Sequence, residues 1–338
     1  MPLYSWGSNA GGHFGTDVGS DYYYPEMMAV EADFETLVAG GEHAIGLTTT
    51  GELFGCGKSS HGQLGRHGDI LSFERLDIAG VRQVATGFRH SLALAESGSV
   101  FVCGDNSKGQ LGLGLDVKER LEWTLLNLEE PVAFICCGVF FSVAVACSGR
   151  VFVWGMNRRK VLDDQDQSII WHPVIKLYSE PIAKASAGHH HLLALSASGK
   201  LFCSGDFGSL HGTLNVADIL SGWKTVLVRY MGDAESLHLH GSNDLGQLCC
   251  TDSHAKGHLI TVRGLKSVAM GGEHGLILTN DALLAWGWNE HGCLGQGHNM
   301  PIKLNYPIKI NFPVEDIIGV YAGYGASYLR TRSLQQGH

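Results

Sequence analysis

One motif recurs along the whole chain and limits the folds open to its 338 residues. The first half of the motif is a Gly, a His three residues later and an apolar run, as in residues 271–279. The second half is another apolar run that ends in an aromatic residue, Gly, any residue and Asn, followed by Gly-x-Leu-Gly, as in 283–295. A repeat of about 50 residues that fills a chain indicates a fold of similar units, each burying its apolar face against its neighbours.

Each half of the motif occurs seven times. The Gly of the first half stands at positions 40, 87, 138, 188, 222, 271 and 323, and the Gly of the second half at 7, 57, 104, 155, 205, 241 and 287. The chain begins on a second half, at 3–9, and ends on a first half, at 320–329. Because these two pieces together complete the seventh copy, the sequence predicts a closed ring whose last unit is formed by both termini.

The apolar runs within each repeat have the length and β-branched composition of strands, as in 81–85 and 99–103. No segment shows the sustained 3.6-residue spacing of a long amphipathic helix. Three clear strands and a less regular outer one fit a four-stranded blade. The sequence therefore predicts an all-β, seven-bladed β-propeller of four-stranded blades in a single domain, 1–338. Its blades are expected at about 37–79, 81–130, 132–181, 184–217, 219–262 and 266–314, with 316–330 and 1–30 forming the last.

The middle copies of the repeat are degenerate. Phe141 stands at the His position of the third blade, residues 158–160 replace its Gly-Gln-Leu, and the outer part of the fourth blade is short. The repeat His is kept at His43, His90, His191 and His274. We expect these side chains to be buried and to bond a neighbouring backbone group, since a recurring His in a crowded inner strand is a packing feature.

Composition narrows the classes of function. With 24 Lys and Arg against 33 Asp and Glu, the formal charge is −9, which disfavours a general phosphate-binding surface. The N-terminus lacks the pattern of a signal peptide, and no apolar run approaches the ~20 residues of a membrane span. The nine cysteines include no Cys-x-x-Cys, so we expect reduced and mostly buried thiols in a cytoplasmic or nuclear protein.

Catalysis and metal binding are not expected. The His groups at 189–191 and 238–240 lack carboxylates or thiolates at ligand spacing, and no Gly-x-Ser-x-Gly occurs. We therefore expect no catalytic residue, no metal site and no cofactor.

The repeated Gly-x-x-His-x-x-x-Leu, Trp-Gly-x-Asn and Gly-Gln-Leu-Gly resemble the regulator-of-chromosome-condensation family of seven-bladed propellers, and the resemblance covers the entire chain. Members of that family include an exchange factor for a nuclear GTPase, other exchange factors and interaction scaffolds, so the repeat specifies the fold and leaves the function open.

One subfamily is similar in more detail. Residues 271–279, 286–292 and 323–329 resemble the C-terminal third of the alpha-tubulin suppressor, or killer-toxin-insensitivity, propeller. That likeness implies a heterodimer with the small zinc-ribbon diphthamide biosynthesis protein three, an electron donor. Through this partner it implies support of Elongator-dependent tRNA wobble-uridine modification and of diphthamide synthesis, without direct binding of nucleic acid or membrane.

The sequence favours a non-enzymatic propeller that binds a protein through exposed side chains of one ring face. The expected partner-binding residues are Trp6, Asn9, Trp286, Trp288, Asn289, Glu290 and His291. For Trp286 a place in the core of its own repeat is the alternative. The alternative function is a guanine-nucleotide exchange factor for a small GTPase. Repeat spacings of at most 52 residues leave no room for the hairpin wedge that the best-known family member inserts into a blade.

Overall fold

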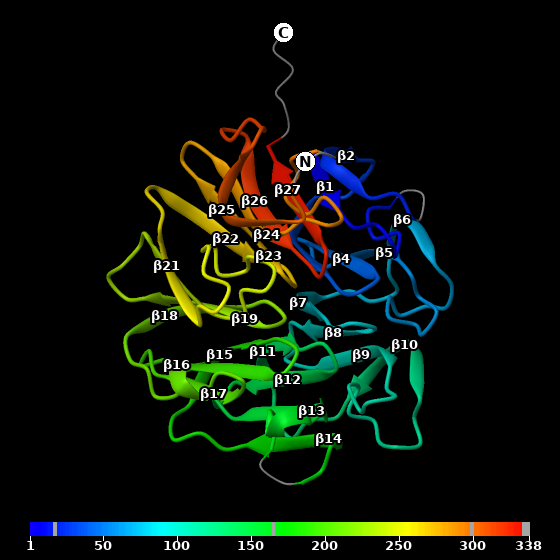
Figure 1. The fold of residues 1–338 in the computed structure, drawn as a ribbon. Helices are drawn as coiled ribbons and strands as arrows, with labels where there is room; N and C mark the ends of the chain where they lie inside the picture. The colour runs from blue at the N-terminus through cyan, green and yellow to red at the C-terminus, as the bar shows by residue number, and fades with distance from the viewer. Residues whose placement is uncertain (16–18, 164–165, 298–300, 333–338) are drawn as a thin grey trace.

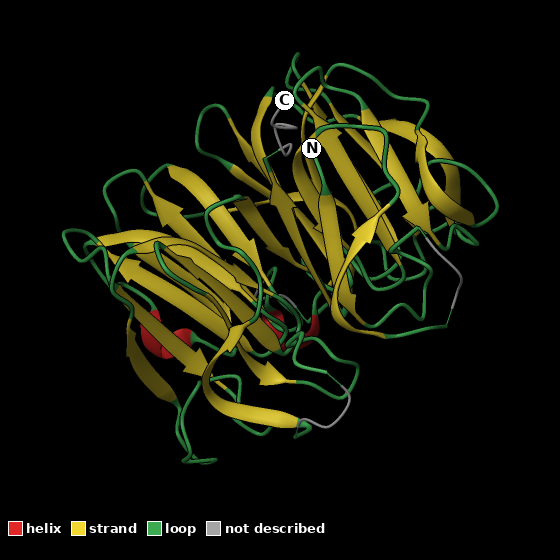
Figure 2. Ribbon diagram, turned by 90° about the horizontal axis from the view of Figure 1, so that it is seen from above, coloured by secondary structure: helices red, strands yellow, loops and turns green. Residues whose placement is uncertain are grey.

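The computed structural model describes residues 1–15, 19–163, 166–297 and 301–332. Their strands form seven antiparallel sheets, which the chain visits in order around a central axis (Figure 1). Strands and loops make up almost the whole molecule, and the helices of the described residues are two short 3₁₀ turns (Figure 2). None of the described helices is long and apolar enough to cross a membrane. The predicted seven-bladed β-propeller is confirmed.

Five blades contain four consecutive strands each. The first has β3 (Phe34–Ala39), β4 (His43–Thr48), β5 (Leu53–Gly57) and β6 (Ile70–Arg75). The second has β7 (Val81–Thr86), β8 (His90–Ala95), β9 (Val100–Asp105) and β10 (Glu119–Leu126). The third has β11 (Val132–Cys137), β12 (Phe141–Ala146), β13 (Val151–Met156) and β14 (Ile169–Lys176). The fifth has β18 (Val216–Ser221), β19 (Thr225–Tyr230), β20 (Ser236–Gly241) and β21 (Gly257–Thr261). The sixth has β22 (Leu265–Met270), β23 (His274–Thr279), β24 (Leu283–Trp288) and β25 (Lys303–Ile310).

Both termini build the seventh blade, as predicted. Its strand order is β2 (Tyr22–Met28), β1 (Leu3–Gly7), β27 (Ala326–Thr331) and β26 (Ile317–Ala322). Strand β1 pairs with β27 from Leu3 opposite Arg330 to Gly7 opposite Ala326, and Figure 1 shows the blue and red ends of the chain side by side. The ring is therefore closed by backbone hydrogen bonds between the two ends of the sequence.

The fourth blade has only three strands, β15 (Ile182–Ala187), β16 (His191–Ser196) and β17 (Leu201–Gly205). A 3₁₀ turn, η2 (Gly208–Leu210), follows β17. The backbone of Leu201 donates to the carbonyl of Thr213 at 2.8 Å, and the His211 imidazole lies 3.3 Å from both backbone polar atoms of Cys203. A short segment and one side chain thus cover the sheet edge that a fourth strand covers in the other blades.

Several first strands begin slightly before the blade limits drawn from the motif. They start at Phe34, Ile182, Val216 and Leu265 in the first, fourth, fifth and sixth blades. The first-half Gly of the motif follows the end of each first strand. The beginning of the strand has no such recurring residue, so the motif does not locate it.

The apolar core lies between neighbouring blades. The second strand of a blade is covered on both sides, and every residue of β4, β12, β16 and β23 is buried. Such strands consist of Leu, Ile, Val, Ala and Gly with few polar residues, because each side faces another sheet. Trp6, Trp154 and Trp286 are the largest side chains of this core and are fully buried.

A clasp loop, the segment that runs from the motif Asn position to the Gly-x-Leu-Gly position, packs each complete blade against the next one. The Asn side chain accepts the backbone N–H of the residue five positions later, at 2.8–3.1 Å, in five loops: Asn9–Phe14, Asn106–Leu111, Asn157–Leu162, Asn243–Leu248 and Asn289–Leu294. A carbonyl of the loop then accepts the indole N–H of the next blade at 2.9 Å: Gln110 from Trp154, Gln247 from Trp286 and Cys293 from Trp6. The Asn and Trp of the motif therefore serve contacts within and between blades.

The repeat His residues are buried, as predicted, but their direct partners are hydroxyl groups. His43 bonds Ser91 at 2.8 Å, His90 bonds Ser142 at 3.0 Å and His274 bonds Ser327 at 2.9 Å, each across a blade junction. Each serine donates its proton to a clasp-loop carbonyl, so the imidazole Nε2–H is the donor to serine. His191 lacks such a partner among the described residues, because Val226 occupies the serine position.

The nine cysteines are all unpaired, and five of them are buried. Cys147 differs from the expectation, since it is exposed in the turn after β12. Burial raises the pKa of Cys293 and Cys249 to about 12, so these thiols are protonated and act as small apolar groups.

Candidate functional site: the channel face

One face of the ring carries the ends of the first and third strands of every blade. There the residue after the second-half Gly donates its N–H to the carbonyl two residues after the first-half Gly, at 2.8–3.1 Å. The seven pairs are Lys58–Glu42, Asp105–Arg89, Met156–Phe140, Asp206–His190, Ser242–Lys224, Trp288–Glu273 and Ser8–Gly325. We call the surface formed by these pairs the channel face, because they surround the mouth of the central channel.

The channel mouth is a cavity of about 140 Å³ lined by the repeat glycines, together with Trp223 and Tyr324. The glycines are required by close approach: a Cβ on Gly222 would lie 2.8 Å from the carbonyl oxygen of Gly271. The residues that follow these glycines differ from blade to blade, and they decide what the mouth offers to a ligand.

Half-buried aromatic side chains form a collar around this mouth. The aromatic collar consists of Phe88, Phe140, His189, Trp223 and Tyr324. Ring centroids are 5.8 Å apart for Phe88 with Phe140 and with Tyr324, 6.0 Å for Phe140 with His189, and 5.1 Å for Trp223 with Tyr324. Partly exposed rings held in a fixed arrangement are typical anchors for a protein partner, because little conformational entropy is lost on binding.

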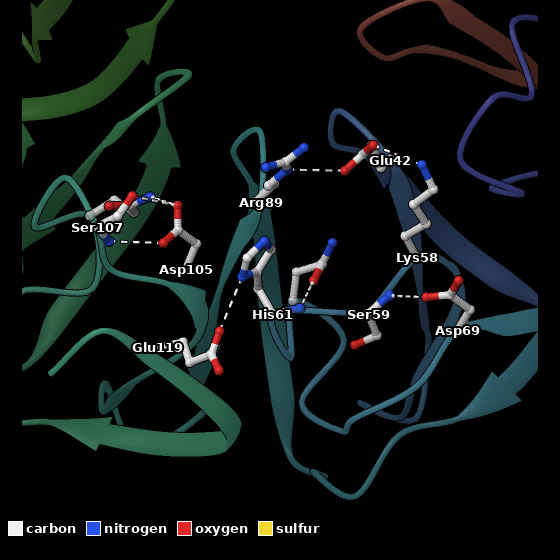
Figure 3. A network of polar contacts seen from close by, with 11 residues as sticks. Glu42, Lys58, Ser59, His61, Asp69, Arg89, Asp105, Ser107 and Glu119 are labelled. Carbon is white, nitrogen blue, oxygen red and sulfur yellow. Dashed lines mark hydrogen bonds and ion pairs between the residues drawn. The ribbon is translucent and has the colours of Figure 1, made fainter.

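The polar side chains of the first and second blades are paired with one another (Figure 3). Glu42 accepts from Lys58 Nζ and from Arg89 Nε, both at 3.0 Å, and His61 lies 3.0 Å from Glu119. Burial by itself would raise the pKa of Glu42, but Lys58 and Arg89 together hold it below its usual value. This part of the channel face is therefore electrostatically satisfied.

The opposite part of the channel face, across the third to fifth blades, carries a surplus of positive charge. Arg158 and Arg159 come from the 3₁₀ turn η1 (Arg158–Lys160), and Lys224 follows the first strand of the fifth blade. Burial, together with the neighbouring His190, Lys224 and Arg158, lowers the pKa of His189 to about 4. Arg159 is paired with Asp206, whereas the carboxylate nearest to Lys224, that of Glu273, is 4.0 Å away, so Lys224 is the weakly paired cation here.

Four of the expected partner-binding residues lie in the core. Trp6 and Trp286 are fully buried and make the indole bonds to the clasp loops. Asn9 and Asn289 are buried and hold their own clasp loops through bonds to Phe14 and Leu294. Because these side chains have almost no accessible surface, they cannot contact a partner directly. Their recurrence reflects the architecture of the repeat.

The other three lie at the surface. Trp288 is half-buried on the channel face and packs edge-on against the His291 ring, with centroids 5.1 Å apart. His291 Nδ1 lies 2.8 Å from a carboxylate oxygen of Asp21, and Glu290 is exposed. Through these contacts the residues form one group at the junction of the sixth and closing blades.

Sequence reasoning missed the aromatic collar. Its signal was present, because the position after the first-half Gly is Gly41 in the first blade and Gly272 in the sixth but an aromatic residue in four others. In the third blade that position is Val139, and the aromatic Phe140 follows it. A variable position beside an invariant glycine marks the surface that the repeat leaves free.

The described residues contain no group of three or more His, Cys, Asp and Glu side chains that could hold a metal ion. His189 and His190 stack on each other with ring centroids 3.8 Å apart, while His191 points into the core against Phe207. The three consecutive histidines therefore do not converge on one point.

The sequence profile of the RCC1-like domain matches residues 2–329. This chain belongs to the RCC1-like family. The secretion-regulating guanine nucleotide exchange factor of Bos taurus is 25% identical over an alignment of 347 positions, which covers 96% of this chain and 70% of that protein. The ultraviolet-B receptor UVR8 of Arabidopsis thaliana is 27% identical over 316 residues, covering 89% of this chain and 64% of the receptor.

Solved structures share the fold. Human WBSCR16 superimposes with a TM-score of 0.83 at 20% identity, covering 98% of this chain and 99% of that one. Prp20p of Saccharomyces cerevisiae gives 0.85 at 18% identity, covering 99% and 92%. The expected likeness to the condensation-regulator propellers is thus confirmed for the whole ring, and this family includes exchange factors.

Proposed function

We propose that this chain is a non-enzymatic propeller that binds a protein partner across its channel face. The observation that carries the proposal is the aromatic collar, whose half-buried rings surround the channel mouth next to the exposed Lys224. Aromatic and cationic side chains are the groups most often found at the centre of protein interfaces. The Trp288 group extends the same surface toward the closing blade.

For the partner we propose the small zinc-ribbon diphthamide biosynthesis protein, with Elongator reached indirectly through it. The support is the resemblance of residues 271–279, 286–292 and 323–329 to the tubulin-suppressor propellers. Much of these segments lies on the channel face or next to it, including Trp288, Glu290 and Tyr324. A role in tRNA wobble-uridine modification and diphthamide synthesis, in the cytoplasm and also the nucleus, follows from that partner and belongs to the same proposal.

The test is binding of the purified zinc-ribbon protein to the full chain, measured by isothermal titration calorimetry. Trp288→Ala and Phe140→Ala are expected to weaken binding at least about tenfold, since buried aromatic anchors contribute 2 kcal/mol or more, roughly, to an interface. Tyr306→Ala is the matched control, because Tyr306 is 58% exposed on the outer strand of the same blade as Trp288.

Melting temperatures of the three variants separate binding from folding. Lost affinity with an unchanged melting temperature supports the proposal. An equal effect of Tyr306→Ala, or no binding by the wild-type chain, contradicts it.

A guanine-nucleotide exchange factor is the second candidate, favoured by the relatives that bear this name. All strands of the described residues belong to the seven sheets, so these residues hold no separate hairpin that could act as a wedge. Release of a fluorescent guanine nucleotide from a panel of small GTPases tests this function. Acceleration by catalytic amounts of the chain would make exchange the leading function.

A further inference from the structure

The fourth and fifth blades are separated on the channel face by a pocket of about 500 Å³. We call it the junction notch, defined by Arg159, His190, Asp206, Lys224, His240 and Lys256. Its walls come from the η1 turn, from the loops after β15, β17 and β18, and from the segments around β20 and β21. It lies directly beside the aromatic collar, because His189 and Trp223 precede His190 and Lys224 in the chain.

The notch exists because one clasp loop is missing. At other junctions the clasp loop packs on the next blade, with Gly62 against Leu121 and Gly246 against Leu304. In the fourth blade Phe207 replaces the Asn that holds this loop, and the chain turns away as η2. The side of the fifth blade that a clasp loop would cover is therefore open.

The missing clasp loop also leaves the side chain of His240 without a hydrogen-bond partner at Nε2 in the described part of the chain. It occupies the position of Trp6, Trp154 and Trp286, whose indole groups donate to a neighbouring clasp loop. The Nε2 atom of His240 has no hydrogen-bond partner among the described residues. At the equivalent junctions, the space beside this side chain is occupied by the backbone of a clasp loop.

The notch is positively charged within a chain whose formal charge is −9. Asp206 is its one carboxylate and is bonded to Arg159. Lys256 is exposed and makes no ion pair within the described residues, and the nearest carboxylate to Lys224 is Glu273 at 4.0 Å. Burial raises the pKa of Glu273, while Gln247 and Lys224 act to lower it, and at 4.0 Å the contact with Lys224 is long for an ion pair.

We propose that the junction notch receives the carboxylate side chains of an acidic segment of a partner protein. The segment lies where a clasp loop lies at other junctions, with its carboxylates toward Lys224 and Lys256 and a neighbouring apolar side chain on the collar at Trp223. This inference rests on the proposed use of the channel face for partner binding and adds the chemistry of the recognised segment. A peptide fits better than a compact phosphate group, because the cations stand on separate loops along the notch and Phe207 gives it an apolar wall.

The probe is a fluorescein-labelled hexaglutamate peptide titrated with the full chain at low ionic strength, followed by fluorescence polarisation. We expect saturable binding that weakens with added salt. Lys224→Gln combined with Lys256→Gln should weaken it about tenfold, since two ion pairs are removed. The matched control is Lys108→Gln with Lys118→Gln, because Lys118 precedes the fourth strand of the second blade as Lys256 precedes that of the fifth.

Three results overturn the inference: no binding of the peptide, equal weakening by the control pair, or full displacement of the bound peptide by inorganic phosphate at matched ionic strength. The last would identify an oxyanion site. Unchanged melting temperatures show that both double variants are folded. The peptide titration contains no partner protein. If the peptide binds but the zinc-ribbon protein does not bind to the full chain, the proposed function fails and this inference stands. If the zinc-ribbon protein binds equally to wild type and to the Lys224→Gln, Lys256→Gln variant, and the peptide does not bind, this inference fails and the proposed function stands.

Discussion

The junction between the sixth and closing blades and the junction between the fourth and fifth blades are built from the same repeat but are held differently. At the first, His274 bonds Ser327, and the Cys293 carbonyl accepts from both Ser327 and Trp6 at 2.9–3.0 Å. At the second, neither His191 Nε2 nor His240 Nε2 has a partner among the described residues. Closure of the ring tolerates one poorly held junction, and the surface freed there is available for recognition.

The largest expected difference is in the free energy of unfolding, between substitutions of Trp6 and of His240, which both precede a second-half Gly. Trp6→Ala removes a fully buried indole and its bond to the Cys293 carbonyl, and should lower the free energy of unfolding by about 3–5 kcal/mol. His240→Ala, at the equivalent position of the open junction, should cost less than about 1 kcal/mol, because no clasp bond is lost.

Urea unfolding followed by tryptophan fluorescence and circular dichroism measures both values. Equal costs at the two positions would show that the junctions are equally well held and would remove the contrast.

The second prediction concerns acid. Burial lowers the pKa of His43 and His191 to about 3 and that of His90 and His274 to about 4, from an ordinary value of 6.5. The unfolded chain takes up protons that the folded chain excludes, so stability present above pH 6.5 is lost as the pH falls toward these values. At pH 5 each buried His should cost about 2 kcal/mol of unfolding free energy relative to neutral pH.

Leucine variants connect this acid effect to the comparison of junctions. His191→Leu removes an acid-sensitive group without losing a hydrogen bond, so stability at neutral pH should be nearly kept and the decline toward pH 5 should become less steep. His274→Leu should show the same smaller decline but lose about 1–3 kcal/mol at neutral pH, because the buried Ser327 hydroxyl loses the imidazole N–H that it accepts. An identical pH profile of wild type and His191→Leu would argue against burial of this side chain as a neutral group.

The smallest expected effect is a difference in local opening. The amide of His189 donates across the open junction to the Trp223 carbonyl at 3.0 Å, and the amide of Gly272 donates across the well-held junction to Gly323 at 3.0 Å. Under native conditions the His189 amide should exchange its hydrogen at least severalfold faster. Hydrogen exchange followed by NMR measures this pair, and slower exchange at His189 would place the weak junction elsewhere.

The sequence predicts the ring because glycine, histidine and asparagine recur at fixed spacing, and recurrence at that spacing reports the packing of one blade on the next. The same recurrence explains why Asn9, Trp286 and Asn289 lie in the core and not on a binding surface. A residue that every copy needs serves the core. Trp288 and Glu290, which exceed the motif, are the ones at the surface.

The junction notch lay beyond the reach of the sequence. The short outer part of the fourth blade and the replacement of Asn by Phe207 were visible. Which side chains this uncovers depends on how one blade overlaps the next, since Arg159, Asp206 and Lys256 are far apart along the chain and meet only across two junctions.

The closing blade sets an order for the synthesis of this protein. Strand β1 lies between β2 and β27, so a strand made before the other six blades pairs on one side with a strand made after them. Six blades can assemble while the chain is still growing, but Trp6 and Leu3 must wait for residues near 330 before their sheet is complete. A nascent chain halted shortly before that point therefore holds an open ring with an unpaired strand edge, the state in which chaperones and proteases would first meet it.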